Sequence, residues 1–171
     1  MDGAAVSDDD ALCRFFPRHL MDENDGLPSP DAFRASNREL SVYHVGQVEK
    51  SSSLVALCFG TLTGNGEAVL TAGEFKEVAQ RVLDRPERPK GAKDDLTGLM
   101  YRPANFPVPE VVWRPNRVSA GREAWRDAHV HVETTSGNEK FPLGYRATLA
   151  MECRVLRLPD PIEEEQDRTA W

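Results

Sequence analysis

Two histidines and a glutamate alternate with apolar residues in the segment 127–133, and these three side chains are the ones best placed by local spacing to do chemistry. In a β-strand, successive side chains point to opposite faces, so His129, His131 and Glu133 would share one face. Two imidazoles at this spacing can bind one divalent metal ion, with the carboxylate as a third ligand. The same groups could act as acid and base, because histidine titrates near neutral pH. A third possibility is an edge or outer strand whose polar face simply meets water.

The signatures that would complete an active site are absent from the sequence. It has no H-E-x-x-H helix, no zinc-deaminase pattern and no G-x-S-x-G nucleophile turn. The glycine-rich stretch at 60–66 lacks the Gly-Lys-Ser/Thr ending of a phosphate-binding loop, and its residues 64–66 are better explained as a turn. His19 and His44 are the other two histidines and lie far earlier in the chain. A metal or acid–base role is therefore the alternative to a non-catalytic function.

A second group, rich in tryptophan and arginine, lies just before this segment and consists of Trp113, Arg114, Arg117, Arg122, Trp125 and Arg126. Arginines interleaved with indoles can hold phosphates and stack on bases, as in proteins that bind single-stranded nucleic acid. The same residue types anchor protein–protein interfaces. The simplest interpretation places the tryptophans in the core and pairs the arginines with acidic neighbours.

The composition is that of one soluble globular domain. The 171 residues can bury a real core, and 40% of them are hydrophobic and 29% charged. The net charge of -7, from 28 acidic and 21 basic residues, disfavours broad binding to nucleic acid or to anionic membranes, because both are negative. The N-terminus lacks the basic and apolar pattern of a signal peptide, and no apolar run reaches membrane-spanning length. Cys13, Cys58 and Cys153 form no C-x-x-C pair and are expected to be buried thiols in a reducing cytoplasm.

Local patterns predict several elements. Strands are expected at residues 40–45, 111–113 and 128–133, and a buried strand or short buried helix at 54–59. Thr71 followed by Glu74 matches a capping box that begins a helix. The apolar face of this helix consists of Phe75, Val78, Ala79, Val82 and Leu83. Residues 145–158 fit both a strand and a helical stripe, and their composition favours a helix.

The remaining segments are expected to be irregular. Residues 84–95 contain no large apolar side chain and predict a surface loop, or a hinge, rich in proline and charge. Residues 1–10 and 161–171 are expected to be disordered acidic tails. The sequence thus predicts a single compact α+β domain over residues 11–160, built from short strands and two main helices.

Several segments resemble a family of small uncharacterised bacterial proteins with an Arg-x-x-Pro, Ala-Phe and Leu-Ser-Val pattern. They are residues 12–17, 32–34, 40–43, 69–74, 128–132 and 156–161, or about half of the chain in pieces. The proline-rich stretch at 84–118 departs from the shorter connection of that family. The resemblance implies a compact α+β domain and no assigned activity.

A second resemblance is to ADP-ribosyltransferase-like folds, which hold NAD with an arginine on an early strand, a Ser/Tyr strand and a glutamate on a late strand. Arg14, Ser41, Tyr43 and Glu133 occur in that order here. The resemblance implies an NAD site as an enzyme alternative.

Together these observations predict a non-catalytic interaction or accessory protein of the bacterial cytoplasm, of the kind found in defence or toxin–immunity operons. Its expected partner is another protein, with no membrane and no cofactor, and nucleic acid is a lesser alternative through the Trp/Arg group. The enzyme alternative uses His129, His131 and Glu133, as a metal-dependent hydrolase-like site with His129 and His131 as metal ligands, or as the transferase-like site.

Overall fold

The computed structural model describes residues 2–50, 64–93, 98–115 and 123–161, and within these ranges the side chains of residues 49, 50 and 123–125 are left undescribed. The elements are β1 (Ala11–Phe16), η1 (Arg18–Leu20), η2 (Pro30–Phe33), β2 (Glu39–His44), α1 (Val45–Lys50), β3 (Gly66–Thr71), α3 (Ala72–Leu83), β4 (Glu110–Trp113), α4 (Glu123–Ala128), β5 (His129–Glu133), α5 (Leu143–Glu152) and β6 (Arg154–Arg157). The predicted strand at residues 54–59 lies outside the described residues.

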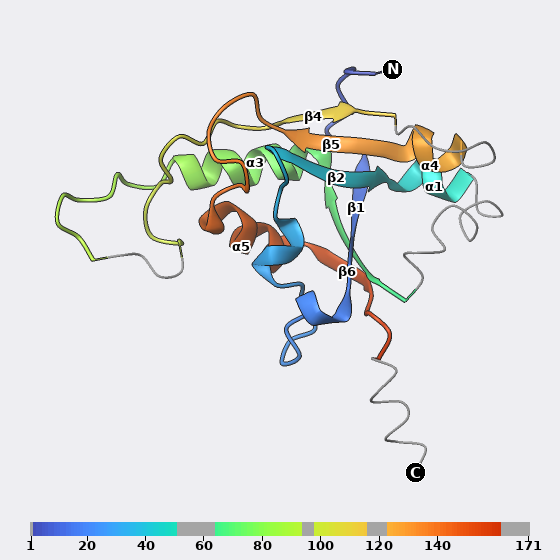
Figure 1. Ribbon diagram of the computed structural model, residues 1–171, viewed down its shortest axis with the longest axis horizontal. Helices are drawn as coiled ribbons and strands as arrows, with labels where there is room; N and C mark the ends of the chain where they lie inside the picture. The colour runs from blue at the N-terminus through green and yellow to red at the C-terminus, as the bar shows by residue number, and fades with distance from the viewer. Residues whose placement is uncertain (1, 51–63, 94–97, 116–122, 162–171) are drawn as a thin grey trace, which may run out of the picture.

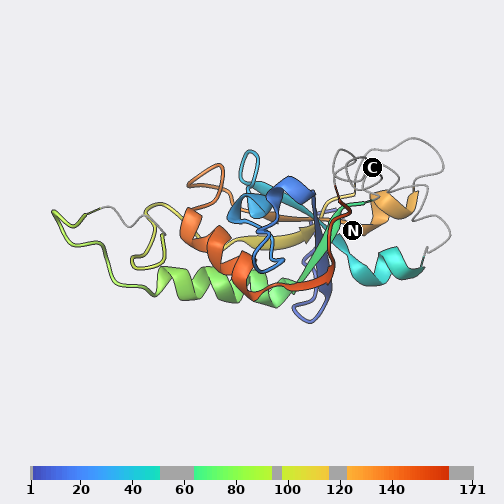
Figure 2. The ribbon, with the colours of Figure 1, turned by 90° about the horizontal axis from the view of Figure 1, so that it is seen from below.

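The six strands form one sheet in the order β4-β5-β2-β1-β3-β6, and every neighbouring pair is antiparallel. The chain is therefore a single α+β domain with two main helices, α3 and α5, as the sequence predicts. Both helices lie on the same side of the sheet, while α1 and α4 lie together beyond the ends of β2 and β5 (Figures 1 and 2).

Alternation along the strands separates an apolar core face from a more polar face. Leu12, Leu40, Val42, Val130 and Val132 are almost fully buried and belong to one core cluster with the apolar side chains of α3 and α5. Directly opposite residues of an antiparallel pair point to the same side of the sheet. The pairing of Val42 with Val130 and of Leu40 with Val132 therefore aligns the apolar faces of β2 and β5.

Helix α3 begins at the predicted capping box. Thr71 Oγ1 accepts a hydrogen bond from the backbone N–H of Glu74 at 3.1 Å, and the Glu74 carboxylate accepts one from the N–H of Thr71 at 2.7 Å. These bonds satisfy two donors that the first helical turn leaves unpaired. Phe75, Val78 and Val82 are buried, which confirms the predicted apolar face.

The ambiguous stretch at 145–158 contains both predicted structures. Its first part belongs to α5, in which Tyr145 and Leu149 are fully buried and the Tyr145 hydroxyl donates to the Phe75 carbonyl at 2.8 Å. The backbone becomes extended at Cys153, and β6 then pairs with β3. The preference for helix over the whole stretch is thus right for α5 and wrong for β6, because pairing with β3 outweighs local propensity.

The N-terminal segment differs from the predicted tail. Backbone hydrogen bonds join Gly3 and Ala4 to Trp113 and Val6 to Val111, and Val6 is 3% exposed. Residues 3–6 therefore extend the sheet beyond β4 and bury an apolar side chain, so they are part of the domain. Residues 3–6 carry no charged side chain, so the acidic residues of this segment do not oppose a pairing that uses backbone groups.

Other expectations have simpler outcomes. Residues 84–93 contain no helix or strand, in agreement with the predicted loop, and residues 94–97 and 162–171 lie outside the description. Cys13 and Cys153 are buried free thiols, and Cys58 is not described. No helix in the described part of the chain is long and apolar enough to span a lipid bilayer.

Candidate functional site

Strand β5 carries the three side chains singled out by their spacing. His129, His131 and Glu133 lie on one face of β5, as predicted, but β5 is flanked by β4 and β2 and is not an edge strand. His129 is 4% exposed, and the side chains of His131 and Glu133 are 16% and 14% exposed. The expectation of an outer strand that meets water is therefore wrong, since this face is largely covered.

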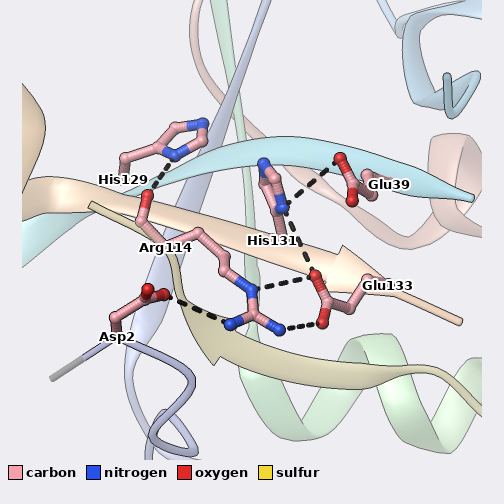
Figure 3. Close-up of polar contacts among 6 residues, drawn as sticks. All are labelled: Asp2, Glu39, Arg114, His129, His131 and Glu133. Atoms are coloured by element: carbon pink, nitrogen blue, oxygen red, sulfur yellow. Dashed lines mark hydrogen bonds and ion pairs between the residues drawn. The ribbon is translucent and has the colours of Figure 1, made fainter. Parts of the chain in front are cut away.

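Glu39 of β2 joins these residues from the neighbouring strand. Glu39 pairs with Glu133 in the sheet register, and Ser41 pairs with His131. The side chain of Glu39 therefore points to the same face of the sheet as those of Glu133 and His131. Nδ1 of His131 lies 3.3 Å from Oε2 of Glu133 and 3.7 Å from Oε2 of Glu39 (Figure 3). The potential ligand atoms of Glu39, His131 and Glu133 all lie within 4.8 Å of one another.

Arg114 holds the carboxylate of Glu133 from the other side. Its Nη2 donates to Oε1 at 2.5 Å and its Nε to Oε2 at 3.2 Å, and its Nη1 donates to Asp2 at 3.2 Å. This two-pronged contact lowers the pKa of Glu133 and raises that of Arg114. Glu133 is therefore a carboxylate at neutral pH and a weak base.

His129 is held differently. Its Nδ1 lies 2.6 Å from the carbonyl oxygen of Arg114, which can only accept, so Nδ1 carries the proton and Nε2 keeps the lone pair. Burial lowers the pKa of His129, and the neighbouring His131 lowers it further, against the opposing effect of the carbonyl. His129 is thus neutral at pH 7. Its ring stands edge-on to that of His131, with centroids 4.8 Å apart, and it does not belong to the group of three potential ligands.

Nδ1 of His131 is the unusual atom of the site. It has no solvent-accessible surface and makes no hydrogen bond of ordinary geometry within the described residues. Its two closest carboxylate oxygens lie beyond the usual 2.7–3.2 Å range for N–H···O bonds, at 3.3 and 3.7 Å. We call Asp2, Glu39, Arg114, His129, His131 and Glu133 the polar cluster.

The Trp/Arg group does not form one exposed surface among the described residues. Trp113 is buried and stacks on the ring of His44 at 4.8 Å. Arg114 belongs to the polar cluster, and Arg126 is exposed beside Asp127 at 2.9 Å. Arg117, Arg122 and the Trp125 side chain lie outside the description. For two of these residues the structure agrees with the simplest interpretation: Trp113 lies in the core, and Arg114 is paired with acidic side chains.

His19, His44 and Arg14 are not brought to the polar cluster, whereas Ser41 and Tyr43 lie on its face: Ser41 pairs with His131, and the ring centroids of Tyr43 and His129 are 5.5 Å apart. His44 contacts Asp10, with Nε2 2.9 Å from the carboxylate, and His19 lies in η1. Arg14 lies on the core face of β1 with Leu12 and donates to the carbonyls of Ala32 and Ser41. The transferase-like set is therefore divided, because Glu133 is on the opposite face of the sheet.

Glu39 and Asp2 are the members of the cluster that sequence reasoning missed. Glu39 begins strand β2, in which polar and apolar residues alternate. This alternation predicts which face of the sheet Glu39 lies on, but not which residue of another strand lies beside it. Only the pairing of β2 with β5 places it beside His131. Asp2 lies in the segment that was expected to be a tail, and no local pattern indicates its contact with Arg114.

A large hollow lies elsewhere on the described part of the molecule. It has a volume of about 820 Å³ and is lined by Leu83, residues 103–107 and residues 136–138, with no member of the polar cluster.

Comparison with known proteins gives no relative: no family model, no curated protein and no solved structure matches this chain. Its function is therefore inferred from its own sequence and geometry.

Proposed function

We propose that this chain is a non-catalytic accessory protein that acts by binding another protein. The proposal places it in the bacterial cytoplasm, in keeping with its unpaired thiols, and in a defence or toxin–immunity setting, in keeping with its small size and acidity. The observation that carries the proposal is the edge strand β6, which carries the exposed Leu156 and is followed by the exposed Leu158.

Strand β6 closes the sheet on one side. Among the described residues it pairs only with β3, so its other edge presents unpaired backbone groups. Leu156 is 64% exposed, and Met151 and Leu158, just before and after the strand, are also exposed. An open edge with an exposed leucine favours pairing with another chain. Charge protects this edge only in part, because Arg154 and Arg157 flank Leu156 and each is paired with an acidic residue of this chain.

A hollow next to β6 adds a place for a side chain. It has a volume of about 260 Å³ and lies between the loop 22–30 and helix α5, with Leu27, Pro28, Ala150 and Met151 among its lining residues. Leu158 lies at the same loop, because a Cβ on Gly26 would be 3.3 Å from its Cδ2. The edge and the hollow are therefore adjacent, and together we call them the β6 surface.

The charge around the hollow favours a basic partner segment, because the two arginines of β6 already have acidic partners: Arg154 lies 3.8 Å from Glu74 and Arg157 lies 3.3 Å from Asp160. Asp22 and Asp25 line the hollow, and each accepts a backbone N–H of its own loop, from Asn24 and Leu27, which fixes the carboxylates in place. The whole chain carries a net charge of -7. The occupant that fits is an extended segment of another protein, with apolar side chains alternating with lysine or arginine, added to β6 as a further strand.

The polar cluster supports a non-catalytic function for this face. Glu133 is held by Arg114 and is a weak base, and His129 is bound to a backbone carbonyl. A catalytic acid or base needs a pKa near the working pH and access to substrate. The lowered pKa of Glu133 and the burial of His129 lack that combination.

A pair of defined peptides tests the proposal. Binding of a labelled peptide with alternating valine and lysine is measured by fluorescence anisotropy, beside a peptide in which glutamate replaces lysine. Leu156→Lys is compared with the control Met100→Lys, because Met100 is 61% exposed and lies in a loop away from β6. We expect the lysine peptide alone to bind, and Leu156→Lys to weaken it by about tenfold, as for loss of an interface anchor.

Three outcomes would contradict the proposal. Equal weakening by Leu156→Lys and Met100→Lys would mean general attraction of a cationic peptide to an acidic protein. If neither peptide binds, an extended partner segment with alternating apolar and basic side chains is excluded. A dimer seen by sedimentation that Leu156→Lys dissociates would make the occupant a second copy of this chain.

A further inference from the structure

We propose that Glu39, His131 and Glu133 form a binding site for a divalent transition-metal cation, with Zn²⁺ as the best match. The site is separate from the β6 surface, because strands β1 and β3 lie between β6 and the strands β2 and β5 that carry the three residues. The inference therefore goes beyond the proposed function and does not depend on it.

The spacing of the three side chains fits a metal ion better than direct hydrogen bonds. Metal–ligand distances of about 2.0–2.1 Å place neighbouring ligands of a tetrahedral zinc about 3.3–3.4 Å apart. Nδ1 of His131 lies 3.3 Å from Glu133 Oε2 and 3.7 Å from Glu39 Oε2. These two separations match two edges of such a tetrahedron to within a few tenths of an ångström, and the third separation, between the two carboxylates, is within 4.8 Å.

The unpartnered nitrogen of His131 is the second observation. Among the described residues its enclosed Nδ1 makes no hydrogen bond of ordinary geometry, and its contacts are the long ones to the carboxylates of Glu133 and Glu39 (Figure 3). Enclosing a polar nitrogen without a hydrogen-bond partner costs free energy. A bound cation would use its lone pair and account for the arrangement.

Arg114 prepares Glu133 for this role. It fixes the carboxylate with hydrogen bonds of 2.5 Å to Oε1 and 3.2 Å to Oε2, the oxygen that also faces His131, and keeps it ionised. Each carboxylate oxygen accepts more than one partner, so Oε2 can bind a metal while Nε of Arg114 donates to it. Outer hydrogen bonds of this kind orient the ligands of metal sites.

Glu39 supplies the adjustable ligand. Its side chain is half-exposed, so it can rotate to close the widest separation in the group, which is within 4.8 Å. Three protein ligands leave the fourth tetrahedral position to water. One imidazole and two carboxylates suit Zn²⁺ or Mn²⁺, whereas Mg²⁺ and Ca²⁺ prefer oxygen ligands alone.

Metal titration of the full-length protein tests the site. The protein is first treated with EDTA and then titrated calorimetrically with Zn²⁺, Mn²⁺ or Mg²⁺ at pH 7.5. We expect one Zn²⁺ per chain, weaker binding of Mn²⁺ and no measurable binding of Mg²⁺. The thermal midpoint should rise with Zn²⁺, because a ligand that binds only the folded state stabilises it.

Matched variants locate the binding. Glu39→Gln removes one ligand charge from a half-exposed position and leaves the fold undisturbed. Glu110→Gln makes the same change at an exposed glutamate that pairs with Glu133 from the opposite strand but is not one of the three ligands. We expect Glu39→Gln to weaken Zn²⁺ binding by about tenfold or more, as for the loss of groups in other metal sites, and Glu110→Gln to change it little. His131→Asn should abolish the binding if the variant folds.

Each other result would overturn the proposal. Equal weakening in Glu39→Gln and Glu110→Gln would mean diffuse attraction to acidic groups. Unchanged binding in Glu39→Gln would place the metal elsewhere in the chain. Absence of Zn²⁺ binding in the wild-type protein would leave the contacts of His131 with the two carboxylates as the explanation of the cluster.

Discussion

Glu133 is the residue at which contacts from three parts of the chain meet. It belongs to β5, its carboxylate is held by Arg114 just after β4, and it pairs with Glu39 of β2. Alternation along β5 is enough to predict that Glu133 and His131 share a face. The identity of the groups that approach them is not a local property, because those groups arrive from other strands.

The buried cysteines allow a prediction at the same scale. Burial raises the pKa of the Cys13 thiol to about 12 and that of Cys153 to about 11. Since the thiolate is the reactive form, we expect neither residue to react with Ellman's reagent in the folded protein at pH 8. Peptide mapping by mass spectrometry distinguishes both from Cys58, and the urea-unfolded protein is the control in which all three react. Rapid labelling of folded Cys13 would contradict its burial.

The same shifts give a pH dependence with a definite sign. In the unfolded chain these thiols ionise near pH 8.5, whereas in the folded protein they stay protonated to higher pH. Their contribution to the free energy of unfolding is therefore complete below about pH 8.5 and is lost as the pH rises towards the folded values. Urea unfolding between pH 8 and 10, repeated with Cys13→Ala, should show a smaller loss in the variant. An equal loss would assign the alkaline sensitivity to other groups.

At the scale of elements, sequence patterns predict correctly those segments whose stabilising contacts are made between residues close together in the sequence. The capping box and apolar stripe of α3 are contacts within one helix, so both could be read correctly. The stretch from α5 to β6 is different, because Cys153 ends the helix and the following residues bond to β3. A helical stripe and a strand alternation coexist there, and only the distant strand decides between them.

Loss of the capping box should weaken the domain measurably. Thr71→Ala removes the acceptor for the Glu74 N–H, and such changes cost about 1 kcal/mol of stability. The free energy of unfolding in urea is the measurement, and Thr135→Ala, at an exposed loop threonine, is the matched control. Equal effects of the two substitutions would show that the cap contributes nothing specific.

At the scale of the whole molecule, the order of the strands decides which residues become a site. Strand β5 lies between β4 and β2, and its polar face is therefore lined by neighbours rather than by water. The N-terminal residues add to the far side of β4, which brings Asp2 to Arg114. Strand β6 is left at the opposite edge with exposed leucines, where the proposed partner segment would add.

The ordered N-terminal segment can be tested by its buried valine. Val6→Ala should lower the free energy of unfolding by about 2 kcal/mol, because the side chain is almost fully buried against the core. The same change at Val108, which is 37% exposed, should have a much smaller effect in the same urea titration. A mobile tail would instead give two indistinguishable variants.

The sequence by itself determines the class of the fold, the face of β5 and the start of α3, because these follow from alternation, helical spacing and capping between neighbouring residues. The tertiary structure alone decides that Glu39 and Arg114 meet His131 and Glu133, that Trp113 is buried, and that β6 is an open edge. The physical reason is that strand pairing joins residues far apart in the chain. The hydrogen bonds between strands join backbone groups, so they do not depend on which residues lie nearby in the sequence. The register and the order of the strands are fixed only when the strands pack together and bury their apolar faces.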